Sequence, residues 1–410
     1  MISQRLRSYV SISVLVTPAP LPPRSLVTYD SSLGTGSLTV PEPGCRTYFV
    51  RLNPKRKPAM KNLLNRSSNS SLISQRASTN FWLLSSLLIA LLTVFTVSAS
   101  AQSLSWSASS SLGVTISGVP GRETPAAAVY NGQMYVAYTS TSVADQFGNK
   151  YVYVGSGTGA AYSGFGYINP SGGVASSNTN PSLVAFKGRL YLAFNNAAPT
   201  GTEFTDIVSF DGTSWGVVTG LPVSGNVLYS PSLATDGTYL YVALLDAATR
   251  TMTLCKSADG STFSCTNFAG SLPDSLGYNP GLAVYNGVLY AGWVTNANSH
   301  DMYYYTSSDQ GVTWTKSNAL DGSQSSCAPH LGAHNGILWY DVRTNDDAHK
   351  FSQRYTTNGV SWANGADAHL AMEGEPAIQD GSGLSIFSQY FYLFYASNDG
   401  TNTLNVTLGS

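Results

Sequence analysis

Charge, cysteine and histidine are scarce in this 410-residue chain. Charged residues make up 10% of it, and it contains four cysteines and five histidines. So few cysteines exclude a small disulfide-stabilised scaffold. The sequence also lacks a P-loop, a dinucleotide-binding fingerprint and a His-Glu-x-x-His motif, so no short motif identifies a cofactor or a metal. We expect the chain to use neither.

The N-terminal quarter has the pattern of an export signal. Residues 81–97, "FWLLSSLLIALLTVFTV", form an apolar run that is followed by "ASA" at residues 99–101. A run of this length before small residues predicts a secretory signal peptide at residues 60–101, cut between Ala101 and Gln102. Residues 1–59 show no sustained period and are interpreted as a disordered leader or an over-extended start. We therefore expect a protein that is secreted, periplasmic or held at the cell surface.

The charge changes sign at this predicted cleavage site. Residues 1–101 contain 11 Lys or Arg and 2 Asp or Glu, whereas residues 102–410 contain 10 and 20. A net charge of −10 on the exported part argues against nucleic acid and anionic membranes as partners, because phosphate binding needs a basic face. Residues 102–410 suit one all-β domain, which we expect to be a monomer.

A repeat dominates residues 102–410. Prolines that each begin a strand pair lie 56, 50, 49, 49 and 47 residues apart, at Pro125, Pro181, Pro231, Pro280, Pro329 and Pro376. They begin similar segments such as "PSLVAFKGRLYLAF" and "PGLAVYNGVLYAGW". A fixed period of this length in all-strand units predicts a β-propeller with six blades, each of four antiparallel strands.

The two ends of the repeat predict how the ring closes. The last repeat ends after its third strand, and an extra strand precedes the first proline. Pairing of residues 104–108 with residues 402–408 would complete the sixth blade and remove two open edges.

The turns between the third and fourth strands have their own pattern. The fullest example is "SSDQGVTW" at residues 307–314. Three other turns have shorter versions of it, "SADGSTF", "SFDGTSW" and "TTNGVSW". This pattern resembles the Asp-box (BNR repeat) of sialidase-like β-propellers over residues 103–410. The resemblance implies that the Asp or Asn of each turn is structural, so we assign no catalytic role to Asp309, Asp259, Asp211 or Asn358.

The resemblance also implies an active site that this chain matches only in part. Sialidases hold the carboxylate of sialic acid with three arginines and use a Tyr–Glu nucleophile with an Asp acid/base. Arg122 stands one residue too far from Pro125, and the family's second arginine is missing. Asp145 lies on the loop of the family's Asp. Arg343 follows the second strand of blade five, a place from which its side chain could reach the axial cleft and bind a ligand. Efficient sialidase chemistry is therefore not expected.

The residues before each proline are expected to surround the axial channel. They include Asn180, Tyr229, Tyr278 and Asn279, whose rings, hydroxyls and amides suit a neutral sugar. The alternative is that they are ordinary strand starts surrounded by water.

Two acids precede the marker prolines of neighbouring blades. Glu123 belongs to blade one and Glu375 to blade six, where they could form the acid/base pair of a glycoside hydrolase, with Asp145 as a further candidate. His330 is a further ligand-binding candidate, and it shares a strand face with His334. That pair could also hold a metal, but exposed histidines without a diagnostic spacing explain it as well.

These observations leave three hypotheses for function. The first is an exported propeller that recognises neutral glycans at its axial cleft. The second is an active glycoside hydrolase, and the third is a cell-surface scaffold that binds proteins through its loops.

Two cysteines are placed symmetrically about one turn. Cys255 and Cys265 flank "KSADGSTFS" and would face each other across a hairpin. They could form a disulfide or remain two half-buried thiols, and Cys327 is expected to be a small buried residue.

Overall fold

The computed structural model describes two compact units, residues 1–98 and 99–410. In the first unit it describes β1 (Gly36–Leu38) and β2 (Tyr48–Val50), which pair antiparallel. In the second it describes residues 105–410 except 117–123, 145–147, 171–174, 198–202, 226–228, 247–250, 269–279, 296–299, 321–323, 326, 335, 346–348, 366–371, 381–383 and 386–388. The predicted signal segment and its cleavage site lie outside the described residues. No helix long and apolar enough to cross a membrane occurs in the described part of the chain.

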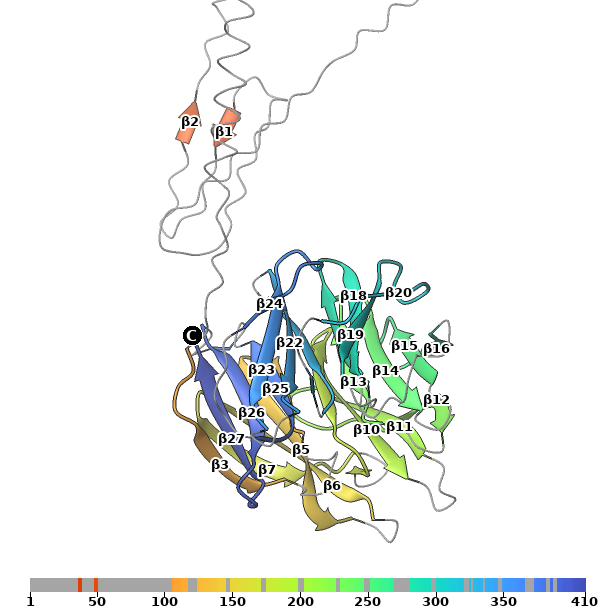
Figure 1. The fold of residues 1–410 in the computed structure, drawn as a ribbon, viewed down its shortest axis with the longest axis vertical. Helices are drawn as coiled ribbons and strands as arrows, with labels where there is room; N and C mark the ends of the chain where they lie inside the picture. Colours follow the sequence, from red (N-terminus) through yellow and green to blue (C-terminus); the bar gives the residue numbers. More distant parts are fainter. Residues whose placement is uncertain are drawn as a thin grey trace, which may run out of the picture. The chain divides into compact units, whose positions relative to one another are not determined.

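The second unit consists of six antiparallel sheets in sequence order, as the repeat predicted (Figure 1). Blade one contains β4 (Ala126–Tyr130), β5 (Gln133–Val143), β6 (Lys150–Thr158) and β7 (Ala161–Tyr167), and β8 (Ser176–Ser177) also pairs with β6. Blade two contains β9 (Ser182–Phe186), β10 (Arg189–Ala197), β11 (Glu203–Phe210) and β12 (Thr219–Gly225). Blade three contains β13 (Ser232–Thr235), β14 (Leu240–Asp246), β15 (Thr251–Ser257) and β16 (Ser264–Asn267).

The remaining blades follow the same order of strands. Blade four contains β17 (Gly281–Tyr285), β18 (Val288–Val294), β19 (Met302–Ser307) and β20 (Thr315–Lys316). Blade five contains β21 (His330–His334), β22 (Ile337–Arg343), β23 (Phe351–Thr356) and β24 (Ala363–Asn364). Blade six contains β25 (Met372–Asp380), β26 (Phe391–Ser397), β27 (Thr403–Gly409) and β3 (Ser110–Thr115).

The N-terminal strand closes the ring, which confirms the prediction (Figure 1, β3 in orange beside β27 in blue). The pairing extends further along the chain than expected. Ser110 pairs with Val406 and Thr115 with Thr403, while Trp106 bridges Gly409. The closing strand therefore lies mainly at residues 110–115, with residues 105–107 continuing the ladder.

The core lies between the blades. Apolar side chains alternate along the second strand of each blade, so one set packs against the preceding blade and the other against the following blade. In β22, Leu338, Tyr340 and Val342 pack against blade four, while Trp339 contacts Phe391 of blade six. Only four buried hydrophobic residues form the cluster between blades five and six, which makes this described interface the least apolar of the six.

The hairpin turns also tie neighbouring blades together. Asn131–Gly132 and Asn286–Gly287 have positive φ at both residues, which is the hairpin-turn conformation that Asn-Gly pairs favour. The tyrosine before each turn, Tyr130 or Tyr285, donates its hydroxyl to a glycine carbonyl in the hairpin of the next blade, at 3.1 and 2.7 Å.

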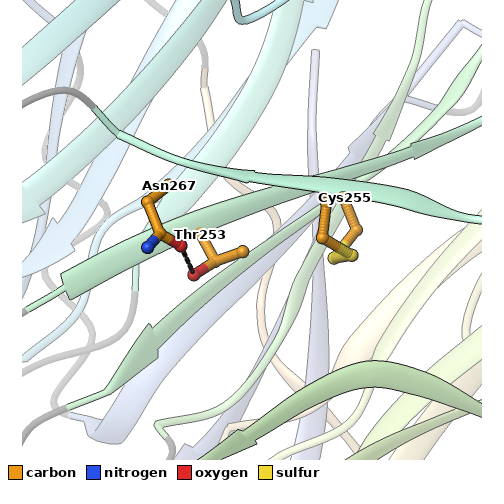
Figure 2. Close-up of a disulfide and its surroundings, with 4 residues drawn as sticks. Thr253, Cys255 and Asn267 are labelled. Carbon is orange, nitrogen blue, oxygen red and sulfur yellow. Dashed lines mark hydrogen bonds between the residues drawn. A yellow bond between two sulfur atoms is a disulfide. The ribbon is translucent and has the colours of Figure 1, made fainter.

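The two cysteines of blade three are bridged. Cys255 on β15 and Cys265 on β16 are directly opposite each other and form a disulfide, and Thr253 Oγ1 donates to Asn267 Oδ1 at 2.9 Å further along the same strands (Figure 2). Cys327 is a buried thiol, as expected.

Candidate functional site

The six innermost strands surround one axial channel with a cavity of about 350 Å³. All six marker prolines line it: Pro125, Pro181, Pro231, Pro280, Pro329 and Pro376. Of the residues predicted to surround the axis because they precede these prolines, Thr124, Asn180, Ser230 and Ala328 line the channel. The channel is the candidate site.

Polar residues at the channel mouth hold adjacent blades together. The Asn180 side-chain oxygen accepts a hydrogen bond from the Thr124 backbone N–H at 3.2 Å, and the Ser230 hydroxyl accepts one from the Asn180 N–H at 2.9 Å. Asn180 and Ser230 are almost completely buried. Asn180 thus lines the channel as predicted, but its side-chain oxygen is bonded to the neighbouring blade.

Tyr229, another predicted ligand-binding residue, does not line the channel. Its backbone N–H donates to Leu245 at 3.0 Å and its carbonyl accepts from the Asn195 side chain at 2.7 Å. The ring packs against the apolar cluster between blades three and four, and burial raises the pKa of its hydroxyl. In blade three, the residue two positions before the marker proline therefore packs in the core between blades and does not line the channel.

Blade five carries the most distinctive part of the channel wall. His330 on β21 lies opposite Asp341 on β22, which in turn lies opposite Gln353 on β23. His330 lines the channel with a third of its side chain exposed, whereas Asp341 has no exposed surface. His330 Nδ1 is 3.8 Å from Asp341 Oδ2, and Gln353 Nε2 donates to Asp341 Oδ1 at 2.8 Å.

The environment of Asp341 favours a proton on the carboxyl group. Burial raises the pKa of Asp341, while His330 and the Gln353 side chain act in the opposite direction. His330 Nδ1 and Asp341 Oδ2 are too far apart for a hydrogen bond, and neither atom has another partner among the described residues. A buried carboxyl group beside a partly exposed imidazole is nevertheless a pairing used in general acid/base catalysis. The arrangement is a candidate acid/base pair in the wall of the channel.

Asp341 was not predicted from the sequence, although the repeat contains a signal for it. The residue after the marker proline and its partner on the second strand are small in four blades: Ala126–Ala137, Ser182–Ala193, Ser232–Ala243 and Gly281–Gly292. In blade five the same pair is His330–Asp341. Comparing this one position across repeats would have identified both residues.

The predicted catalytic acids lie where side chains are not described. Glu123 and Asp145 fall outside the described residues, as do Arg122, Tyr278 and Asn279. Glu375 lies on β25, a strand that packs beside both β4 and β22. Blades six and one are therefore neighbours, as the proposed Glu123–Glu375 pair requires, and the pair itself stays a prediction.

Arginines are not found in the described channel lining. Arg343, predicted to reach the cleft, ends β22 two residues after Asp341 and does not line the channel. Its backbone N–H donates to the Cys327 sulfur at 3.4 Å. Arg189 donates through Nε to Ser209 at 3.1 Å, and Arg354 lines a different cavity.

The aspartates of the predicted structural turns are bonded within those turns. Asp309 Oδ1 accepts from the backbone N–H of Val312 and Thr313 at 3.1 and 2.9 Å, and the Ser307 hydroxyl donates to it at 2.7 Å. These bonds hold the pKa of Asp309 well below its usual range. Asp309 does not line the channel.

The other histidines form no metal site in the described residues. His334 lines the channel and packs edge-on against Phe391 at 4.7 Å, while His349 lies 3.2 Å from the Asn398 amide. The described part of the chain contains no group of three or more His, Cys, Asp or Glu side chains arranged to hold a metal.

The sequence matches no family model and no curated protein. By structure, the chain is similar to a sialidase from Trypanosoma rangeli solved with the inhibitor DANA, with a TM-score of 0.52 and 13% identity over 75% of this chain and 60% of the sialidase. It is also similar to a protein of unknown function from Dyadobacter fermentans, with a TM-score of 0.53 and 13% identity over 75% of this chain and 99% of that protein. The chain thus spans about 60% of the trypanosomal sialidase. The likeness shows the fold, a six-bladed propeller of the sialidase kind.

Proposed function

We propose that this chain is an exported sialidase-like propeller that recognises neutral glycans at its axial channel and lacks efficient sialidase chemistry. The observation that carries the proposal is the neutral polar lining of the channel. Hydroxyl, amide and imidazole groups line it, and none of its described lining residues is Asp, Glu, Lys or Arg. Such groups hydrogen-bond sugar hydroxyls, and Trp339 and Phe391 at the same channel add apolar surface for a sugar ring.

Sialic acid is the less suitable ligand for this channel. Its carboxylate would lose water without gaining a guanidinium from any described lining residue, and desolvating an unpaired charge is costly. The acidic composition of residues 102–410 adds to the repulsion. The fold shared with a sialidase supports the choice of glycans as the ligand class.

Export is part of the proposal. The apolar run at residues 81–97 and the following "ASA" support a cleaved signal peptide, and the Cys255–Cys265 disulfide is typical of an oxidising compartment. N-terminal sequencing of exported protein should therefore begin near Gln102. Recovery of residues 81–97 in the membrane fraction would point to an anchored propeller instead.

A glycan array probed with the chain and its variants tests the proposal. We expect the chain to bind neutral glycans. The His330→Ala variant should bind them with an affinity about tenfold lower or weaker still, because His330 supplies a hydrogen-bonding group in the channel wall. His349→Ala is the matched control, since His349 does not line the channel. Release of sialic acid that depends on Arg122 would contradict the proposal, and the absence of any glycan signal would favour a protein-binding scaffold.

A second candidate, a glycoside hydrolase, is favoured by the His330–Asp341 pair. This pair replaces small residues found at the same position in four other blades. If the pair is the acid/base, Asp341→Asn should abolish turnover of chromogenic neutral glycosides while Glu375→Gln leaves it unchanged. Loss of turnover with Glu375→Gln alone would assign the chemistry to the sequence-predicted acids.

A further inference from the structure

A second cavity lies away from the channel, between the outer strands of blades four and five. It has a volume of about 340 Å³ and is lined by Tyr304, Ser317, Asn318, Ala319, Leu320, Arg354, Val360, Trp362 and Asn364. Blade four contributes Tyr304 and the segment after β20, and blade five contributes the remainder. Aromatic, amide and cationic groups therefore meet in one groove.

Among the described residues that line this groove, Arg354 is the one cation, and it is half-buried on β23. Its Nη1 donates to the Gln353 carbonyl at 3.0 Å and to the Ser352 hydroxyl at 3.4 Å, while its buried Nε has no acceptor among the described residues. Among the described side chains, the one ion pair joins His330 and Asp341, so no described carboxylate lies within ion-pair distance of Arg354. Burial lowers the pKa of Arg354. A desolvated guanidinium without a carboxylate partner gains most from binding an anion.

The rest of the groove suits a sugar ring rather than a bare ion. The ring of Trp362 packs at 5.3 Å from Tyr304, and Leu320 is buried beside them in the same cluster. Exposed Asn318 and Asn364 place amide groups on the rim. An aromatic floor with amide donors and acceptors above it is the surface that holds the face and the hydroxyls of a sugar.

The cavity beside Arg189 can be compared with the groove of Arg354, because each is lined by one arginine. Arg189 of blade two lines a smaller cavity, of about 230 Å³, together with Asp259. Hydrogen bonds from the backbone N–H groups of Ser214 and Thr213 lower the pKa of Asp211, and Arg189 contributes to the same shift, so carboxylates lie near Arg189. The groove of Arg354 has no Asp or Glu among its described lining residues.

We propose that the groove between blades four and five binds a sugar carboxylate of the hexuronic acid class, with Arg354 holding the carboxylate and Trp362 supporting the ring. This site is separate from the axial channel and takes a charged sugar, whereas the channel takes neutral ones. The overall acidity of the propeller does not prevent it, because long-range repulsion is screened over about 8 Å at physiological salt.

Calorimetric titration of the chain with glucuronate tests the inference. Glucose, which has the ring without the carboxylate, and acetate, which has the carboxylate without the ring, are the matched ligands. We expect glucuronate to bind at least about tenfold more tightly than either, since the site uses a charge-assisted hydrogen bond and a stacked ring together. Equal binding of glucose or acetate, or no saturable binding of glucuronate, would overturn the proposal.

Variants locate the binding to the groove. Arg354→Gln should weaken glucuronate binding about tenfold or more and Arg354→Lys by less, because Lys keeps the charge but loses the fork of donors. Arg189→Gln removes the same charge from the other cavity and should leave the affinity unchanged. Asn318→Ala, an exposed rim change that cannot unfold the blade, should weaken binding by a smaller factor.

The indole N–H gives a readout that is independent of heat. In a spectrum of ¹⁵N-labelled tryptophan side chains, Trp362→Phe assigns the Trp362 signal by its disappearance. We expect glucuronate to shift that signal and glucose to leave it in place. Unchanged affinity in both Arg354→Gln and Asn318→Ala, or a Trp362 signal that glucuronate does not move, would place the ligand elsewhere and refute the assignment.

Discussion

At the scale of single residues, the position after each marker proline distinguishes blade five from the others. Small side chains there allow the innermost strands to pack closely around the axis, as Gly281 does, where an added Cβ would lie 2.4 Å from the Pro329 carbonyl oxygen. In blade five, His330 instead places an imidazole in the wall of the axial channel, with the buried carboxyl group of Asp341 behind it. Burying a carboxyl group with one amide bond and a distant imidazole costs stability, so a repeat that tolerates this pair gains something other than packing.

The cost of Asp341 predicts a pH dependence that can be measured. Because burial raises the pKa of Asp341 in the folded state, the folded chain binds a proton there more tightly than the unfolded chain. Its favourable contribution is complete below the ordinary Asp pKa of about 3.9 and is lost as pH rises through the folded value. Asp341→Asn should therefore gain stability relative to the wild type as pH rises from about 4 toward neutrality.

Denaturant unfolding at a series of pH values, taken as variant minus wild type, checks this result. The difference removes the contributions of other acids that titrate in both proteins. His330→Ala is the informative companion, since loss of the neighbouring imidazole should raise the pKa of Asp341 further and extend the window upward. A difference that stays constant across the pH range would show that Asp341 ionises as freely in the folded chain as in the unfolded one.

At the scale of elements, the turns between third and fourth strands act as local braces. A turn with similar hydrogen bonds joins the second and third strands of blade six, β26 and β27: Asp399 accepts from the Thr401 N–H at 2.9 Å and from the Ser397 hydroxyl at 2.8 Å. These bonds lower the pKa of Asp399 to about 2. Asn358 makes the same backbone bonds in blade five without a charge, to Val360 and Ser361 at 2.9 and 2.8 Å. The shared role is therefore hydrogen bonding and not catalysis.

The Cys255–Cys265 bridge is the one covalent brace among the described elements, and its loss has a definite expected effect. Replacing both residues by Ala frees a hairpin that the bridge closes over 10 residues of sequence separation. Loop-closure entropy suggests a loss of about 2.7 kcal/mol in the free energy of unfolding.

Thermal and denaturant unfolding with and without reductant measures that loss. Reductant should destabilise the wild type to the level of the double variant and should leave the double variant unchanged. If the wild type and the double variant unfold alike under oxidising conditions, the bridge does not stabilise blade three.

At the scale of the whole molecule, the sequence was sufficient for the fold and insufficient for the site. The proline period and the missing final strand predicted six blades and their closure, because both can be recognised along the chain without knowledge of tertiary contacts. The side chains that meet in the channel wall depend on strand register and on which face each residue takes. Tyr229 and Asp341 show this: a shift of one position placed Tyr229 in the core, and a single acid inside the apolar "ILWYDVR" strand lies buried directly behind His330 of the channel wall.

Closure of the ring is the property on which the remaining fold depends, and two deletions separate its parts. Removing residues 103–110 eliminates the edge-on contact of Trp106 with Phe351 at 5.7 Å and the bonds from Ser105 and Ser107 to Ser410 and Leu408, but leaves most of β3. Removing residues 103–116 also eliminates β3 and Ile116, which is fully buried between blades six and one. The longer deletion should therefore lower the melting temperature much more than the shorter one.

The longer deletion exposes the edge of β27, and the behaviour of that edge can be measured. With β3 gone, its unpaired backbone groups should pair with another chain, so light scattering should detect association at concentrations where the intact protein stays monomeric. A synthetic peptide covering residues 105–116 should bind that edge and restore both the melting temperature and the monomer. Equal melting temperatures for the two deletions, or a peptide that has no effect, would show that the ring holds without its N-terminal strand.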